Sequence, residues 1–282
     1  MNKRIYFLLL ALVVFSGLTS CDIIEGDQKC YECIQSGSNK KILLEDFTGH
    51  YCGNCPKSHH EAEFLDSLYH DTTIIVLNLH GGAWFSAPHP ALGFTADYRT
   101  KFATDLDSVY HAEGTEGYPI GMVNRRVFNS NILVKYSDFG TRIASVLSDL
   151  PGGTLEVTSA YDAGTNSTNI AVNTELFNNY SSGVSLNVLI KEDSIISPQE
   201  DYDEPDDVIE DYVHMHMCRY AVTSGLWGEM LSANVSQGDF FTRNYTVALD
   251  TAWVPAHCSV VAFLRDNSNG EVLQAAEIKL VP

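Results

Sequence analysis

Hydrophobic and polar residues follow two different periods along this chain, and the change falls near residue 151. Before it, three runs have the length and apolar content of buried strands, at residues 41–47, 72–79 and 120–128. Three further segments read as helices, at residues 56–69, 96–110 and 136–150. Strands that alternate with helices predict an α/β domain over residues 40–151.

After the Pro151-Gly152-Gly153 break, short strands follow one another without helices between them. They are expected at residues 154–160, 169–176, 184–191, 245–249, 259–265 and 272–280. The turn-forming run Asn267-Ser268-Asn269-Gly270 joins the last two into a hairpin. This pattern predicts an antiparallel, immunoglobulin-like β-sandwich over residues 152–282.

The first residues have the order of a secretory signal peptide. Lys3 and Arg4 precede an apolar run over residues 5–15, and small residues lead to Cys21. We therefore expect residues 1–20 to be a lipoprotein signal peptide, Cys21 to carry the lipid anchor, and the polar residues 21–39 to be a tether. The alternative is a transmembrane helix, but the run is shorter than the roughly 20 residues that span a bilayer.

Composition narrows the classes of function. A formal net charge of −19 excludes nucleic acid as a partner. The acidic residues are spread widely along the chain and indicate no other partner. No cofactor is indicated. A hydrophobic content of 45% is enough to fill one or two cores. Without Cys21, six of the seven cysteines remain. Disulfides persist in exported proteins, and an even number of cysteines indicates that they pair.

Cys52 and Cys55 carry the clearest chemistry. Two cysteines separated by two residues can close a small disulfide ring, and a helix that starts there stabilises the first thiolate. Cys52 is then the nucleophile, facing solvent, and Cys55 the shielded resolving thiol. The alternative is an inert disulfide that is part of the fold.

The segment around this motif resembles the active site of the thioredoxin superfamily. Asp46 lies six residues before Cys52 on the preceding strand, and Tyr51 is the aromatic residue before the motif. The resemblance implies a proton relay by Asp46 and a cis-proline at Pro119. The extra residues 80–95 read as an inserted loop that walls the site.

The other cysteines allow several arrangements. Cys30-x2-Cys33 followed by Cys52-x2-Cys55 has the spacing of a four-cysteine zinc site. We favour instead a Cys30–Cys33 disulfide beside Cys52–Cys55, with exchange between the two dithiols left open. We predict a Cys218–Cys258 disulfide within the second domain, because both cysteines lie in strand-like segments.

A His-Met-His-Met-Cys run, residues 214–218, is a weaker candidate for chemistry. Strand alternation would place His214, His216 and Cys218 on one face, where they could bind copper or zinc. Core methionines and hydrated histidines explain the same pattern, so we expect no metal site. The acidic run 200–207 lacks the glycine and spacing of a calcium loop and reads as a solvated turn.

The CxxCP motif and the His214-x-His216…Arg219…Trp227-Gly228 segment together resemble the outer-membrane-protein-28-related lipoproteins, over nearly the whole mature chain. This resemblance implies a thioredoxin-like domain, a β-rich domain, and a place in the outer membrane or on the cell surface of a Gram-negative bacterium.

Two functions are compatible with these features. The first is a membrane-anchored thiol–disulfide oxidoreductase acting on exported proteins through Cys52, Cys55, Asp46 and Pro119. The second is a surface-ligand-binding lipoprotein in which Cys52–Cys55 is structural and the contacts come from the β-sandwich or from the Trp84-Phe85 loop.

Overall fold

The computed structural model describes residues 40–69 and 73–281, which belong to one compact unit. The signal peptide and tether expected over residues 1–39 lie outside the described residues, and with them Cys21, Cys30 and Cys33.

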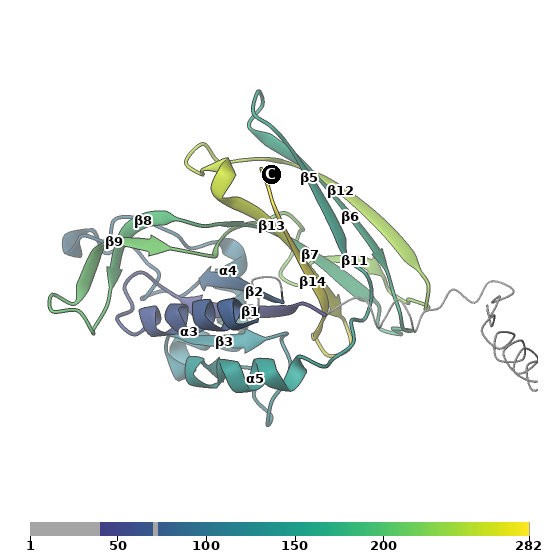
Figure 1. Cartoon of the computed structure of the whole chain (residues 1–282), viewed down its shortest axis with the longest axis horizontal. Helices are drawn as coiled ribbons and strands as arrows, with labels where there is room; N and C mark the ends of the chain where they lie inside the picture. The colour runs from purple at the N-terminus through teal and green to yellow at the C-terminus, as the bar shows by residue number, and fades with distance from the viewer. Residues whose placement is uncertain (1–39, 70–72, 282) are drawn as a thin grey trace, which may run out of the picture. The chain divides into compact units, whose positions relative to one another are not determined.

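The first part of the chain has the expected alternation of strands and helices. Strand β1 (Ile42–Thr48) leads into helix α3 (Cys55–Leu68), and β2 (Ile74–His80) returns parallel to β1. Helix α4 (Lys101–Tyr110) follows, then β3 (Ile120–Val123), β4 (Val134–Lys135) and helix α5 (Phe139–Val146). Strand β3 is antiparallel to β1, and β4 pairs with β3. The local order across the sheet is β2-β1-β3-β4; Figure 1 labels the first three of these strands.

This sheet continues into the second part of the chain. Strand β10 (Met217–Ala221) is parallel to β2, and beyond it lie β7 (Val184–Glu192), β13 (Cys258–Asp266) and β14 (Val272–Lys279). Strand β11 (Glu229–Ser232) also pairs with β7. Among the described residues, nine strands thus form one mixed sheet, and the boundary expected near residue 151 does not interrupt it.

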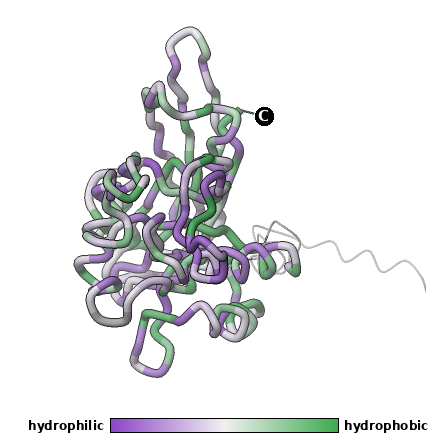
Figure 2. Tube along the Cα trace, turned by 90° about the vertical axis from the view of Figure 1, so that its left-hand side faces the viewer, coloured by the Kyte–Doolittle hydropathy of each residue, from purple (hydrophilic) through white to green (hydrophobic). Residues whose placement is uncertain are grey.

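A second, antiparallel sheet of three strands covers part of the first. Its order is β12-β6-β5, from β5 (Glu156–Asp162), β6 (Ser167–Glu175) and β12 (Phe240–Ala248). Buried and less buried residues alternate along these strands, because one face packs and the other meets solvent. Figure 2 shows how hydropathy changes along the trace.

Strands β7 and β13 are buried on both faces, which joins the two parts. Val188 and Val260 belong to one apolar cluster, which also contains residues of β6. Their neighbours Leu189 and Val261 belong to another, which also contains residues of α4. The expected sandwich strands are therefore present, but one of their sheets is shared with the α/β part.

A buried ion pair lies at the same junction. Arg125, which follows β3, donates two hydrogen bonds of 2.7 Å each to the carboxylate of Glu45 on β1. Both side chains are fully buried, and the guanidinium lies 4.9 Å from the ring centre of Phe263 on β13.

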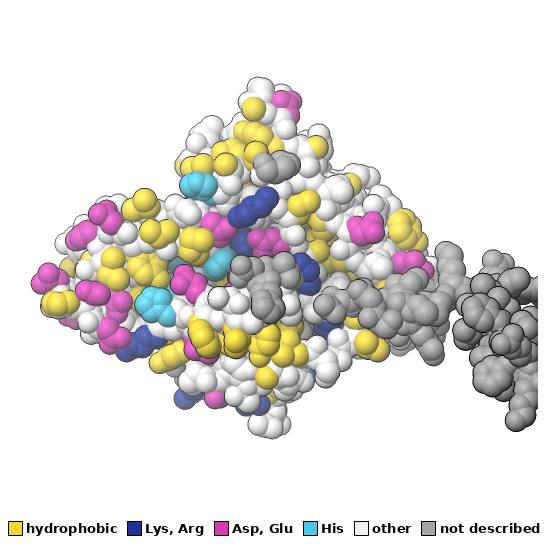
Figure 3. Space-filling model, in the orientation of Figure 1, with side chains coloured by type: hydrophobic (Ala, Val, Ile, Leu, Met, Phe, Trp, Pro, Cys, Tyr) yellow, Lys and Arg dark blue, Asp and Glu magenta, His cyan; other side chains and the backbone are white. Residues whose placement is uncertain are grey.

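Strands β8 (Ile195–Glu200) and β9 (Val208–His214) form a separate two-stranded hairpin. The acidic run at residues 200–207 makes its turn, as expected of a solvated segment. Figure 3 shows acidic side chains over this end of the molecule.

Candidate functional site

Cys52 and Cys55 are joined by a disulfide, with their Cα atoms 5.4 Å apart. Helix α3 begins at Cys55, with Pro56 in its first turn, and the Cys55 amide donates to the carbonyl of Cys52. The chain therefore turns tightly between β1 and α3, and this turn brings the two sulfur atoms together.

The β8–β9 hairpin covers this turn. The Gln199 side-chain amide donates to the carbonyl oxygens of Gly49 and Cys52, at 3.2 Å in each case. The amide of Glu200 donates to the carbonyl of His50 at 2.8 Å, and that of Tyr202 to the carbonyl of Gly53 at 2.9 Å. The hairpin is thus hydrogen-bonded along the disulfide turn.

Both cysteines are buried in consequence. Cys52 is 2% exposed and Cys55 is 0% exposed. The expectation that Cys52 faces solvent is therefore wrong. It rested on the start of the helix alone, whereas a hairpin from the second part of the chain covers the turn.

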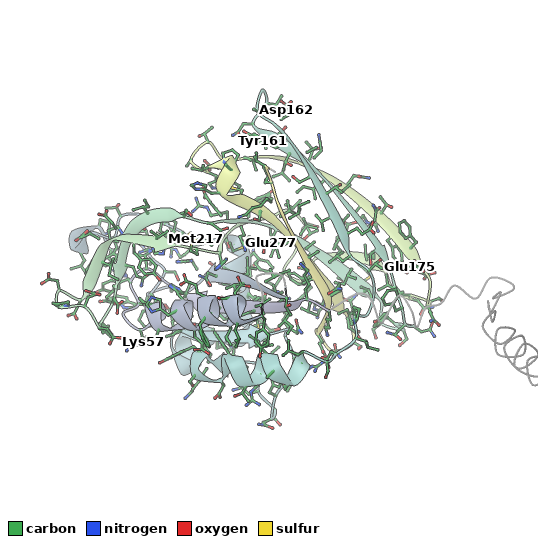
Figure 4. All side chains as sticks on the ribbon, in the orientation of Figure 1. Lys57, Tyr161, Asp162, Glu175, Met217 and Glu277 are labelled. Carbon is green, nitrogen blue, oxygen red and sulfur yellow. A yellow bond between two sulfur atoms is a disulfide. The ribbon has the colours of Figure 1, made fainter. Side chains whose placement is uncertain are left out.

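Tyr202 explains why residue 53 is a glycine. A Cβ atom at Gly53 would lie 2.3 Å from Cδ1 of the Tyr202 ring, a distance that real contacts do not reach. Lys57, labelled in Figure 4 on α3, adds an ion pair of 3.2 Å with Asp203 in the hairpin turn.

The segment 80–95 lies against the other side of the turn. The amide of Tyr51 donates to the carbonyl of Phe85 at 3.0 Å, and Ser86 donates to the carbonyl of Thr48. The rings of Tyr51 and His89 are 4.1 Å apart, and Trp84 packs edge-on against both. The predicted insertion is therefore in contact with the motif.

Glu113 anchors this loop, a role that the sequence did not predict. Its carboxylate accepts hydrogen bonds from the amides of Ala83, Trp84 and Phe85, at 2.7 to 2.9 Å. The sequence carries no direct signal for this contact; the structure shows that it needs a glycine at residue 82, where a Cβ would lie 2.4 Å from a Glu113 oxygen.

Pro119 has the expected cis peptide bond with Tyr118. Tyr118 donates a hydrogen bond of 2.9 Å from its hydroxyl to Asp107. Its ring belongs to the same apolar cluster as Cys52 and Cys55, so the cis-proline segment and the disulfide share one core.

Asp46 is fully buried on β1, and Ser58 of α3 donates to it at 2.7 Å. Burial raises the pKa of the Asp46 carboxyl to about 8, and the hydrogen bond from Ser58 acts in the opposite direction. Phe47, the next residue, packs in the cluster that holds the disulfide. Side chains alternate along a strand, so Asp46 points to the opposite face, toward α3.

Four histidines are buried next to this region, namely His50, His59, His80 and His214. His59 shares hydrogen bonds with Thr48 Oγ1 at 2.8 Å and with the hydroxyl of Tyr212 at 2.7 Å. Burial lowers the pKa of His59 to about 3 and that of His50 to about 4.

The expectation that His214, His216 and Cys218 share one strand face is wrong. Strand β9 ends at His214, His216 has a positive φ of 57°, and β10 begins at Met217. His214 packs against Tyr212, with ring centres 4.9 Å apart, whereas His216 Nδ1 lies 3.5 Å from Asp193. Within residues 40–69 and 73–281, no three His, Cys, Asp or Glu side chains are arranged to hold a metal ion.

The predicted Cys218–Cys258 disulfide is also wrong. Both cysteines are free thiols within the described part of the chain. Cys218 pairs with Lys191 on one side of β7, and Cys258 pairs with Glu192 on the other. Two strand spacings separate them by about 9–10 Å, beyond the reach of a disulfide. They also face opposite apolar clusters.

Of the four cysteines with zinc-site spacing, the structure describes only Cys52 and Cys55, and these two do not support zinc binding. Cys52 and Cys55 are bonded to each other, so neither offers a thiolate to an ion in this state. The partner cysteines, Cys30 and Cys33, lie outside the described residues, as does their expected disulfide.

Comparisons with known proteins agree with the β-rich architecture. The family model described as outer membrane protein Omp28 matches residues 106–281. The structure of HBP35 of Porphyromonas gingivalis aligns with a TM-score of 0.63 and 16% identity, over 86% of this chain and 76% of that one. This second likeness concerns the fold.

A domain of the outer membrane lipoprotein Omp28 from Porphyromonas gingivalis aligns with a TM-score of 0.29 and 16% identity, over 46% of this chain and 88% of that one. No curated protein matches the sequence. None of the helices in the described residues is long and apolar enough to cross a membrane.

Proposed function

This chain belongs to the Omp28 family of outer membrane proteins, and we propose that it is an exported, lipid-anchored protein of the outer membrane or cell surface whose Cys52–Cys55 disulfide is structural. In this proposal the protein binds a surface ligand or an exported protein, and the disulfide fixes the turn on which the β8–β9 hairpin rests.

A thioredoxin-like first part is included in the proposal. Support comes from the β2-β1-β3-β4 order, the parallel pairing of β1 with β2, and the disulfide at the start of α3. The cis peptide bond before Pro119, next to β3, adds to it.

The burial of Cys52 carries the choice of a structural disulfide. Thiol–disulfide exchange requires a thiolate to reach one sulfur atom. With Cys52 only 2% exposed, and with Gln199 and the amide of Tyr202 bonded to the turn around it, an attacking thiolate has no approach in this state.

Accessibility of the disulfide tests this proposal. We expect Tyr202→Ala and Gln199→Ala to increase the rate of reduction by a phosphine at least tenfold, because each removes part of the cover. Ile196→Ala is the matched control, since this β8 residue is 66% exposed and lies on the same hairpin. Rapid reduction of the unchanged protein, with no effect of either variant, would contradict the proposal.

One observation favours the second candidate, an oxidoreductase acting on exported proteins. Asp46 is buried on the strand before the motif and accepts a hydrogen bond from Ser58 in the first turns of α3, and burial raises the pKa of its carboxyl to about 8, so it can exchange a proton near neutral pH. In that mechanism the hairpin moves away and the Cys52 thiolate attacks a substrate disulfide. Cys55 then displaces the substrate thiolate, oxidising the dithiol and reducing the substrate.

Trapping distinguishes the two candidates. If the protein is an oxidoreductase, Cys55→Ala accumulates mixed disulfides between Cys52 and exported proteins, and Pro119→Thr enriches them. Under the structural proposal we expect no trapped species from Cys55→Ala beyond those formed by a Cys52→Ala, Cys55→Ala control.

A further inference from the structure

We propose that His80 and His214 form a binding site for a monovalent copper ion, Cu(I), between the end of β2 and the end of β9. This inference goes beyond the proposed function and does not depend on it. It rests on two buried imidazoles from distant parts of the chain and on the spacing between them.

The fold brings the two rings together. His80 is the last residue of β2 and is paired in register with Thr48 of β1. His214 is the last residue of β9 and comes from the hairpin that covers the disulfide turn. Their ring centres are 6.2 Å apart, with planes at 71°.

Both imidazoles are 2% exposed and lack ordinary partners. Neither nitrogen of His80 has a hydrogen-bond partner among the described residues. The carbonyls of Ser197 and Pro198 lie near His214, but neither completes a well-oriented hydrogen bond with its ring in this part of the chain. Buried polar atoms without protein partners are costly, so imidazole nitrogens of this kind in one place require a bridging partner, either water or an ion.

The surroundings keep both rings neutral, as metal coordination requires. Burial lowers the pKa of His214 to about 4 and that of His80 well below its ordinary value. The neighbouring His59 is already engaged with Thr48 and Tyr212, so it does not compete for the ion.

Coordination number and ring spacing select the ion. Zn²⁺ takes four ligands in most structural sites. Imidazole is also a copper ligand, and Cu(I) is stable between two donors in line. An ion held at about 2.0 Å from one nitrogen of each ring, with the two bonds in line, requires ring centres about 6 Å apart; the observed separation is 6.2 Å.

Competition with a chromophoric Cu(I) chelator tests the site on the full mature chain, with ascorbate present to hold copper reduced. We expect one high-affinity ion per chain and a loss of affinity of at least tenfold in both His80→Asn and His214→Asn. His60→Asn is the control, because His60 is exposed on α3. Unchanged binding in both buried variants, or no binding by the unchanged protein, would overturn the proposal.

If either variant fails to fold, X-ray absorption of the Cu(I)-loaded, unchanged protein still tests the site, because it identifies the atoms bound to copper. Two nitrogen donors in line are the expected result. Sulfur donors would assign the copper to cysteines and overturn the site.

Discussion

Gly53 is the residue at which the contact between hairpin and disulfide turn is tightest. A methyl group there meets the Tyr202 ring, so Gly53→Ala must displace that ring or the backbone of the hairpin or turn. We predict a loss of about 1–3 kcal/mol in the free energy of unfolding, as for other overpacked sites. Urea titration measures it. Gly114→Ala should be near neutral, because a Cβ there meets nothing within 4 Å; equal effects of the two changes would contradict the account.

Asp46 predicts a pH dependence of stability. Its pKa is about 8 in the folded chain against roughly 3.9 when unfolded, so the folded state holds the extra proton between these values. The contribution of Asp46 to the free energy of unfolding is therefore largest below about pH 4. It declines by about 1.4 kcal/mol per pH unit between there and about pH 8.

The variant Asp46→Asn should remove this decline, since the amide stays neutral and can still accept from Ser58. Unfolding free energies at pH 5, 7 and 9 measure the difference between variant and unchanged protein. Parallel pH profiles would mean that Asp46 is ionised in the folded chain.

At the scale of elements, Glu113 holds one end of the loop 80–95. Glu113 accepts three backbone hydrogen bonds from residues 83–85, so Glu113→Ala should release the loop. We predict several-fold faster cleavage by chymotrypsin after Trp84 or Phe85. Glu210→Ala, a change at an exposed position of β9, should leave the rate unaltered; similar rates in both variants would argue against the anchor.

The elements also show what the sequence could and could not predict. The residues 42–48, 74–80 and 258–266 are strands as expected, because continuous apolar runs identify buried strands whatever their partners. The pairing of Met217 with Asn78 was not predicted. The residues of a strand do not specify which distant segment of the chain it will pair with. The same limit led to the wrong Cys218–Cys258 bond.

The candidate site was predicted unevenly for the same reason. Local spacing was enough to find Cys52, Cys55 and the cis bond before Pro119. The cover supplied by Gln199 and Tyr202 comes from about 150 residues later in the chain and has no local signal.

For the whole molecule, the shared sheet predicts cooperative unfolding. Strand β10 joins β2, and the buried Arg125 links Glu45 to the ring of Phe263 across the boundary near residue 151. We expect residues 40–281 to unfold in one thermal transition, with calorimetric and van't Hoff enthalpies in agreement. Two separated transitions would indicate that the parts are independent.

Membrane attachment is the other property of the whole molecule, and it depends on Cys21. If the lipid on Cys21 is the anchor, Cys21→Ser should move the protein out of the membrane fraction or leave it unprocessed. Labelling with a palmitate analogue and fractionation test this expectation. A variant that stays in the membrane, together with an unchanged protein that takes up no label, would contradict it.

The reduction potential of Cys52–Cys55 tests the central claim most directly. Equilibration of the folded, full-length mature protein with defined thiol–disulfide buffers, followed by mass spectrometry of residues 52–55, gives this value. A structural disulfide protected by the β8–β9 hairpin predicts a potential below about −300 mV. A value between about −270 and −120 mV, the range of disulfide-exchanging enzymes, would contradict the account.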